Sequence, residues 1–489
     1  MLRKVKYRIL FSILLVLCAL NSSNIAQDQV QVASLQSEVK ACFSELLSKS
    51  NDIGYVFYDS KGNELASYNK NKALTPASNQ KIVTSGAAYK ILSSSFKFQT
   101  IIFHKGKIAN GQLFGDLIVY GAGDPTIGTN YNGTDESREI FKDFAKKIKD
   151  AGIKVVTGDI IFIKTMFDNE YRHKDWPEDQ ILKYYEAPIS ALSFNDNCIN
   201  LDISAGSTLS SPAKVTITPK YSGINVLNKV YTRKAGGNPI ISYNYQDDST
   251  LVVSGTIPLR SQSYTSDVAV MNPEKLFSEV FAGTLGESGI IINGFVKIPD
   301  TETSLLDAEP LIVHQTNLMK ILKIMNQQSQ NFYAELVFKR VGAFSSKKTG
   351  SFETGKVAVS EFLKNLSIDS IEFEIADGSG LSNSNRLSVN ALSKVLLYFP
   401  EEMRKTLAVS GDAEGTMKRR FIGNMKGKIY AKTGTINKVD ALSGYIVDSS
   451  EHWHPFSIIV NTNGHNHSVV RQKMDSAVKI VFDYFAKND

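Results

Sequence analysis

The sequence predicts an α+β fold, in which one antiparallel sheet flanked by helices is split along the chain by a long β-rich insertion. Helix and strand patterns gather at both ends of the chain, and residues 98–311 between them alternate short β-rich runs with turn residues. A helical pattern then resumes. We therefore predict a main domain divided between residues 27–97 and 312–489, with one or two accessory domains inserted in it.

The two ends of the chain supply complementary parts of the predicted sheet. The first end has the pattern of a helix, two strands joined by a turn, and a second helix that begins near Pro76. The second end has the pattern of two helices, three strands and a closing helix. The segments are 34–48, 53–58 and 64–68 before the insertion, and 318–325, 332–341, 428–433, 441–447, 453–461 and 469–486 after it.

The insertion is predicted to be β-rich because its apolar runs are short. They contain many β-branched and aromatic residues, and Gly, Ser, Asn and Asp separate them. The clearest runs are 117–120, 154–156, 159–163, 214–217 and 251–253.

Composition limits the class of protein. The chain has 489 residues, of which 42% are hydrophobic and 21% charged, so it is globular and too long for one ordinary core. The net charge of +6 is spread along the chain, without a Lys/Arg block or basic residues interleaved with aromatic ones. We therefore predict no nucleic-acid partner.

Residues 1–26 are predicted to form a secretory signal peptide. A basic stretch precedes the apolar run Ile9–Leu20, which is too short for a comfortable membrane span. Cleavage is expected between Ala19 and Gln27, and a large residue before Cys18 disfavours lipidation. We expect secretion across the cytoplasmic membrane to the periplasm or cell envelope, with peripheral membrane association left open.

The mature chain keeps Cys42 and Cys198. Two cysteines are too few for a disulfide framework, and they lack metal-ligand spacing. We expect buried small side chains, leave their pairing open, and predict no metal site.

Ser78 and Lys81 are a candidate nucleophile and base. They lie three residues apart at the expected start of a helix, where residues i and i+3 share a face and unpaired N–H groups favour negative charge. A lysine can take the serine proton only if burial or another cation lowers its pKa, so a second cation is expected nearby. The same spacing at Ser37, Ser94 and Ser345 is more typical of solvated helix surfaces.

A Lys-Thr-Gly triplet occurs twice. The triplet at residues 348–350 lies among serines after a helix, which indicates an exposed loop. The segment Lys432-Thr433-Gly434-Thr435 instead ends a predicted strand that a hairpin follows. The glycine would let a ligand lie against the strand edge, and the lysine and hydroxyls could bind a carboxylate.

Ser329-Gln330-Asn331 joins two predicted helices. Ser329 could take part in catalysis or serve as a plain N-cap of the second helix, and the local sequence leaves both interpretations open. The segment Asp377–Ser382 follows a predicted strand at 371–375 and is interpreted as a tight turn, with Ser382 near the site.

The histidines do not support a Ser-His-Asp triad. His452, His454, His465 and His467 lie on a predicted turn and loop, without an evident carboxylate to orient them.

Ser-x-x-Lys, Ser-x-Asn and Lys-Thr-Gly occur in the chain order of the penicillin-recognising acyl-enzymes. The chain resembles the D-alanyl-D-alanine carboxypeptidase/endopeptidase family of class C low-molecular-mass penicillin-binding proteins. The resemblance spans the mature chain, including the insertion after the catalytic helix. Further matching segments are 115–117, 123–126, 185–192, 377–382 and 414–417.

The resemblance implies a penicillin-binding transpeptidase/β-lactamase-like domain that acts on D-Ala-D-Ala stem peptides of peptidoglycan. Ser78 would attack the carbonyl between two D-alanines, or that of a D-centre cross-link, while Lys81 accepts its proton. The backbone N–H groups of Ser78 and Thr435 would form the oxyanion hole. β-Lactams would acylate the same serine.

The resemblance also gives roles to the other motifs. Ser329 would relay a proton to the leaving amine, and Asn331 would hold the substrate amide. Lys432 would be the second cation and, with Thr433 and Thr435, would bind the terminal carboxylate. Water would hydrolyse the acyl-enzyme, so the resemblance implies no metal or cofactor. The alternatives are a β-lactamase or esterase on the same fold, and a non-catalytic penicillin-sensing or cell-wall-binding protein.

Overall fold

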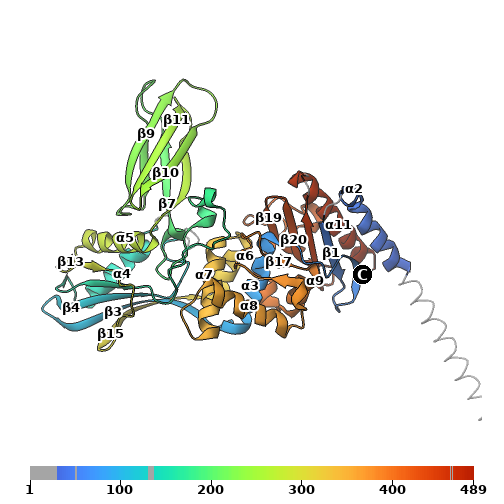
Figure 1. The fold of residues 1–489 in the computed structure, drawn as a ribbon, viewed down its shortest axis with the longest axis horizontal. Helices are drawn as coiled ribbons and strands as arrows, with labels where there is room; N and C mark the ends of the chain where they lie inside the picture. Colours follow the sequence, from blue (N-terminus) through green and yellow to red (C-terminus); the bar gives the residue numbers. More distant parts are fainter. Residues whose placement is uncertain (1–29, 50–51, 130–136, 463, 465, 489) are drawn as a thin grey trace, which may run out of the picture. The chain divides into compact units, whose positions relative to one another are not determined.

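The computed structural model describes residues 30–488, apart from 50–51, 130–136, 463 and 465 (Figure 1). The predicted signal peptide lies outside these residues. The chain forms two compact units, and each is described by itself. The first contains the chain up to Asn79, Ile368–Phe373 and Arg386–Asp489, and the second contains Gln80–Ser367 and Glu374–Asn385.

The first unit is built on a six-stranded sheet with the order β18-β19-β20-β21-β1-β2. All its pairings are antiparallel, and its strands come from both ends of the chain. This confirms the predicted split sheet. The strands are β1 (Asp52–Tyr58), β2 (Glu64–Tyr68), β18 (Ala408–Val409), β19 (Ile429–Ile436), β20 (Val439–Val447) and β21 (Trp453–Asn461).

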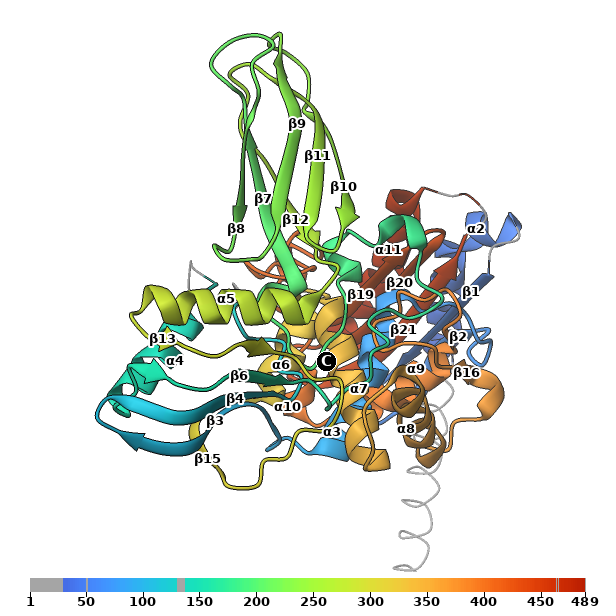
Figure 2. The ribbon, with the colours of Figure 1, turned by 60° about the vertical axis from the view of Figure 1, so that its left-hand side comes forward.

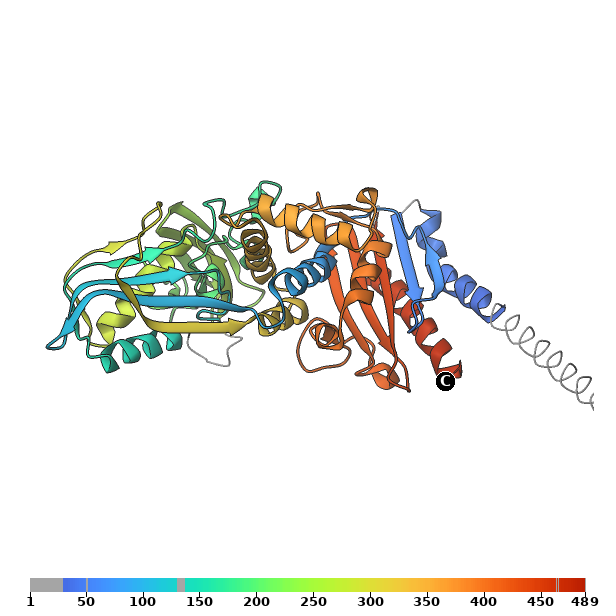
Figure 3. The same ribbon diagram turned by 90° about the horizontal axis from the view of Figure 1, so that it is seen from below.

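Both faces of this sheet are covered by helices (Figure 3). Tyr55, Leu442 and Ile458 belong to a core shared with the helix at residues 30–42, α2 and α11. On the other face α9 packs against the sheet, and Ser393 of α9 donates a hydrogen bond to Ser457 of β21. The helices are α2 (Ser44–Ser48), α9 (Val389–Tyr398), α10 (Glu401–Arg404) and α11 (His467–Asn488), and a short strand β17 (Arg386–Leu387) precedes α9.

The second unit contains a seven-stranded sheet. Five strands follow the order β13-β5-β4-β3-β15, and β14 pairs with β6, which pairs with β4. The strands are β3 (Lys97–Ala109), β4 (Gln112–Gly121), β5 (Val155–Val156), β6 (Ile160–Ile163), β13 (Ile291–Ile292), β14 (Val296–Lys297) and β15 (Ala308–Asn317).

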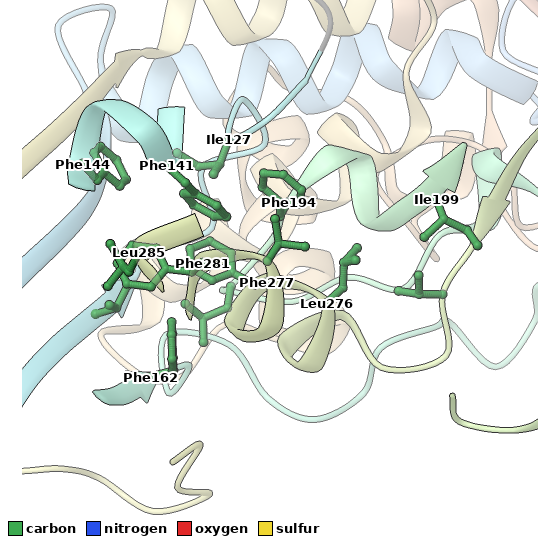
Figure 4. Packing of buried hydrophobic residues seen from close by; sticks show 14 of the residues in the cluster. Ile127, Phe141, Phe144, Phe162, Phe194, Ile199, Leu276, Phe277, Phe281 and Leu285 are labelled. Atoms are coloured by element: carbon green, nitrogen blue, oxygen red, sulfur yellow. The ribbon is translucent and has the colours of Figure 1, made fainter. Parts of the chain in front are cut away.

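Two helices that the sequence analysis missed pack in one hydrophobic core with this seven-stranded sheet: α4 (Glu139–Asp150) and α5 (Pro273–Glu287). Phe141 of α4 packs against Phe277 and Phe281 of α5, and it also stacks on Phe194, which lies outside both helices, with centroids 4.7 Å apart (Figure 4). Fully burying one such side chain contributes about 1.5–3 kcal/mol. A signal for α5 was present, because Asn272 caps its N-terminus immediately before a proline.

The remaining strands of the insertion form two three-stranded sheets, β12-β7-β8 and β10-β11-β9. Figure 2 labels the strands of both sheets, β7 to β12. The insertion is therefore β-rich, as predicted, while its boundaries at residues 98 and 311 stay a prediction. The strands are β7 (Cys198–Ser204), β8 (Lys214–Thr218), β9 (Asn225–Arg233), β10 (Ile240–Asp247), β11 (Thr250–Pro258) and β12 (Tyr264–Ala269).

Four helices of the second unit pack on one another: α3 (Gln80–Leu92), α6 (Leu318–Gln327), α7 (Asn331–Ser346) and α8 (Phe352–Asn365). The sequence analysis did not predict α8, although Ser351 and Thr354 form a capping box at its start. The predicted strand 371–375 is shortened in the structure, because a 3₁₀ turn precedes a strand β16 of only two residues, Phe373–Glu374.

Cys42 is half-buried and Cys198 is buried, and both are free thiols. Within the described residues, the helices are too short or too polar to span a membrane.

Candidate active site

Ser78 lies in the first unit, in a 3₁₀ turn (η1, Ala77–Asn79) that leads directly into α3. Pro76 therefore precedes the helix instead of occupying its first turn. Ala77 has a backbone φ of 48°, which costs a residue with a side chain of order 1 kcal/mol or more. Such strain next to a half-buried serine is typical of functional turns, where surrounding contacts hold the backbone.

Contacts with β19 and β20 hold this turn. In the amide orientation that satisfies both groups, Asn79 donates to the Lys432 carbonyl at 2.9 Å and accepts from Ser443 Oγ at 2.7 Å. A Cβ on Gly434 would lie 3.0 Å from the Pro76 carbonyl oxygen and 3.1 Å from the Ser78 nitrogen. The glycine therefore keeps the strand close to the Ser78 backbone, a reason that the sequence analysis did not foresee.

The side chains of the Lys-Thr-Gly segment differ in exposure. Lys432 is fully buried, and its Nζ donates to the Thr433 carbonyl at 2.7 Å. Thr433 is half-buried and Thr435 is exposed. Since β18 pairs only with the first part of β19, residues 432–436 have no strand on that side in the described part of the chain. The edge expected from the sequence is therefore present.

Lys81 lies in the second unit, on the first turn of α3, and is fully buried. Its Nζ donates to Asn331 Oδ1 at 2.7 Å and to the Ser379 carbonyl at 2.9 Å. Burial lowers the pKa of Lys81 to about 7, although Glu335 and Asp377 favour its charged form. Burial, one of the two causes that the sequence analysis allowed, therefore lowers this pKa, and the expected second cation stays a prediction.

The turn at residues 377–382 does more than reverse the chain. Buried Glu335 accepts hydrogen bonds from the Gly378 and Ser379 N–H groups at 2.8 and 2.7 Å, which fixes the carbonyl that Lys81 contacts. Asp377 closes the turn by accepting from the Gly380 and Ser382 N–H groups at 2.7 and 2.6 Å. Burial and Asp377 raise the pKa of Glu335 to about 8.

Sequence reasoning missed Glu335. Its position one helical turn after Asn331 was a usable signal, since residues i and i+4 share a face of α7.

Asn331 connects two segments of the second unit. Its Oδ1 accepts from Lys81, and its Nδ2 donates to the Tyr185 carbonyl at 3.0 Å. The N-cap of α7 is Gln330, so the interpretation of Ser329 as a plain N-cap is wrong. Ser329 is half-buried in the connection, with a φ of 59° that only surrounding structure can hold.

Two other expectations change. In the Lys-Thr-Gly triplet at residues 348–350, Lys348 and Thr349 are exposed, but Gly350 is buried and pairs with Phe167 through an isolated bridge. The histidines do have carboxylate partners: His452 and His454 both contact Asp448.

His467 contacts Asp440 in the same way. These carboxylates are distant from the histidines in sequence or separated by a turn, so local pattern alone did not reveal them. No group of three or more His, Cys, Asp or Glu residues among those described is arranged to hold a metal ion.

A helix-covered antiparallel sheet, a serine entering a helix and a Lys-Thr-Gly strand are the architecture of the penicillin-recognising serine enzymes. Residues 35–482 match the D-Ala-D-Ala carboxypeptidase 3 (S13) family, and the chain belongs to this family. Membership makes it a serine-type D-Ala-D-Ala carboxypeptidase, and so a hydrolase, by class.

Curated relatives match across most of the chain. It is 28% identical to a D-alanyl-D-alanine carboxypeptidase of Actinomadura sp. over 456 residues, which cover 89% of this chain and 82% of the relative. It is 26% identical to the D-alanyl-D-alanine carboxypeptidase DacB of Haemophilus influenzae, with 83% of this chain and 84% of the relative covered.

Solved structures share the fold. Penicillin binding protein 4 of Haemophilus influenzae matches with a TM-score of 0.79 at 24% identity, over 91% of this chain and 98% of that one. The same protein has been solved in complex with a β-lactam, with a TM-score of 0.75 at 24% identity, over 91% of this chain and 99% of that one. A predatory peptidoglycan endopeptidase of Bdellovibrio bacteriovorus matches with a TM-score of 0.51 at 15% identity, over 89% and 94% of the two chains.

Proposed function

We propose that the protein hydrolyses D-Ala-D-Ala peptides of peptidoglycan through an acyl-enzyme on Ser78, and that penicillin acylates the same serine. The observation that carries the proposal is the state of Lys81. It is buried, its pKa is lowered to about 7, and it follows Ser78 by one helical turn. A neutral amine there has two hydrogens, for which Asn331 and the Ser379 carbonyl are acceptors, and a lone pair for the serine proton.

The first step is acylation. Ser78 attacks the carbonyl carbon of the penultimate D-alanine while its hydroxyl proton passes to Lys81. The N–H groups of Ser78 and Thr435 stabilise the oxyanion, at a few kcal/mol per donor in analogous sites. The closeness of Gly434 to the Ser78 nitrogen supports this pairing.

The intermediate then collapses and is hydrolysed. Ser329 passes a proton to the leaving amine, so D-alanine departs, and Asn331 holds both Lys81 and the substrate amide. Lys432, Thr433 and Thr435 bind the terminal carboxylate. Water, deprotonated by Lys81, then attacks the acyl-enzyme and releases the shortened peptide.

The proposed location is the periplasm or cell envelope, where peptidoglycan lies. It rests on the basic and apolar N-terminal sequence and on relatives named as a D-alanyl-D-alanine carboxypeptidase and a peptidoglycan endopeptidase. The same chemistry would cleave a D-centre cross-link, so endopeptidase activity is part of the proposal.

Incubation with a stem peptide that ends in D-Ala-D-Ala tests the proposal directly. We expect release of one D-alanine per peptide, and a stable mass increase on the Ser78 peptide after treatment with benzylpenicillin. Stable acylation without D-alanine release would favour a penicillin-sensing protein. Rapid turnover of penicillin would favour a β-lactamase.

The pH dependence of acylation should report the pKa of Lys81. Only the neutral amine accepts a proton, so with a pKa of about 7 the reactive fraction rises about tenfold between pH 6 and pH 8 and then levels off. The rate of penicillin acylation measured over this range should follow that curve. A flat rate between pH 6 and pH 8, with unchanged thermal stability, would contradict Lys81 as the base.

A further inference from the structure

Thr435, at the end of β19, is part of a network with a second cation. Arg471 of α11 donates from Nη2 to Thr435 Oγ1 at 3.0 Å and from Nε to Asp440 Oδ1 at 3.0 Å. The other oxygen of Asp440 contacts His467 Nδ1 at 2.7 Å. All four residues lie in the first unit.

Asp440 and Arg471 differ in exposure, which gives them different roles: Asp440 anchors Arg471, and Arg471 can bind a ligand. Asp440 is only 1% exposed, whereas the Arg471 side chain is 46% exposed. The buried carboxylate therefore holds the guanidinium through one edge and leaves the rest accessible. An arginine fixed in this way presents planar donors suited to a carboxylate without a further loss of side-chain freedom.

The hydrogen bond to Thr435 also sets the direction of the hydroxyl. A guanidinium can only donate, so Thr435 Oγ1 accepts from it and its single hydrogen must point elsewhere. Its acceptors in the structure are the Gly434 carbonyl at 2.8 Å and Asp440 Oδ1 at 3.2 Å. A bound carboxylate could take that hydrogen, because donation by Arg471 polarises the hydroxyl.

The charges at this end of the strand favour an anion. Arg471 is a cation of the network, Lys432 is a second cation on the same strand as Thr435, and Asp440 is the one acid of the network among the described residues. A ligand carboxylate would therefore meet one surplus positive charge. If Arg471 served only to join α11 to β20, its ion pair with Asp440 would be enough. The added bond to an exposed hydroxyl of the Lys-Thr-Gly strand is what points to a ligand.

We propose that Arg471 is a further specificity-determining residue, which with Thr435 recognises the free carboxylate beside the leaving amine of the substrate. The inference rests on the proposed function, because it adds a residue to that site. It predicts that Arg471 contributes to the rate for substrates with a free carboxylate and not to the rate for their amides.

Two matched peptides test this: a stem peptide ending in D-Ala-D-Ala, and the same peptide with a C-terminal carboxamide. In Arg471→Gln, kcat/KM for the acid should fall by about 10- to 100-fold, the range for losing a charge-assisted hydrogen bond. The value for the amide should change less than about threefold. Arg471→Lys should fall between the wild type and Arg471→Gln, because a lysine keeps the charge but cannot span both partners.

Arg420→Gln is the matched control. Arg420 also pairs with an acid on α11, Asp475, but it contacts none of the residues of the Thr435 network. It should leave the acid-to-amide ratio unchanged. Equal losses for acid and amide in Arg471→Gln, or no loss for either, would overturn the inference. Wild-type protein that releases no D-alanine would overturn the proposed function itself, and the inference with it.

Discussion

Replacing Ser78 with alanine should abolish both penicillin acylation and D-alanine release, with a loss of at least about 10⁴-fold in kcat/KM. The hydroxyl is the only group that the proposed mechanism joins covalently to the substrate, so no neighbouring residue restores the step. Alanine fits the 3₁₀ turn, in which Ala77 and Asn79 already flank the serine. We therefore expect little change in the temperature of unfolding, which calorimetry can check.

Ser94→Ala is the matched control. Ser94 precedes Lys97 by the same three residues, but it lies in the turn between α3 and β3, where no helix begins. Both activities should remain at the wild-type level. Penicillin bound at any residue other than Ser78, found by mass spectrometry of proteolytic peptides, would refute the assignment of the nucleophile.

The sheet of the first unit could be predicted because its signals are local. In β19, β20 and β21 the residue pattern and the intervening turns fix the strands to within a few residues, and the burial of β20 and β21 between helices follows from runs in which apolar residues outnumber polar ones. The antiparallel order required only that hairpin neighbours pair. Joining these strands to β1 and β2 required the additional idea that an insertion divides one sheet.

The state of Lys81 could not be predicted from local sequence. Its pKa depends on complete burial, and the side chains and carbonyl that surround it come from residues 331, 335 and 377–379, more than two hundred positions away. Sequence reasoning supplied a chemical requirement, a lowered pKa, and allowed burial or a second cation as its cause, but only the structure shows that burial is the larger cause. In the same way, the positive φ of Ala77 is imposed by tertiary contacts, because an alanine carries no preference for it.

The Ser379 carbonyl is a functional group that no motif search would select. It is a backbone atom, and its position depends on a turn that two buried carboxylates hold. The glycines and serines of this turn predicted its shape, but only the structure connects it with Lys81. The turn is therefore where an unpredicted residue, Glu335, should have the largest effect.

Glu335→Gln should lower kcat/KM by about 100-fold and destabilise the fold by about 1–3 kcal/mol. The carboxylate has an acceptor for each of the Gly378 and Ser379 N–H groups, whereas an amide offers one oxygen and one NH₂. One buried N–H group would lose its hydrogen-bond partner, which costs about 1–3 kcal/mol of stability. The Ser379 carbonyl would then shift away from Lys81, and a misplacement of about 1 Å can reduce a rate by about 10².

A change in the pH profile would separate positioning from simple destabilisation. The ionised Glu335 carboxylate favours the protonated form of Lys81, whose pKa is about 7, and the pKa of Glu335 is raised to about 8. Glu335 therefore becomes partly ionised over the upper part of the acylation profile, where its negative charge opposes the loss of the Lys81 proton. A neutral glutamine removes that anion, so Lys81 should lose its proton at lower pH and the midpoint of the acylation profile should move down. Loss of stability alone would lower the amplitude and leave the midpoint in place.

Glu274→Gln provides the comparison, because it alters another buried carboxylate of the second unit. Glu274 accepts a hydrogen bond from Ser190 at 2.7 Å and belongs to α5, within the insertion. It should reduce the temperature of unfolding without moving the midpoint of the pH profile. If Glu335→Gln behaves in the same way, Glu335 is a structural residue only. A downward midpoint confined to Glu335→Gln would instead show that the turn, α7 and Lys81 act as one unit in setting the base.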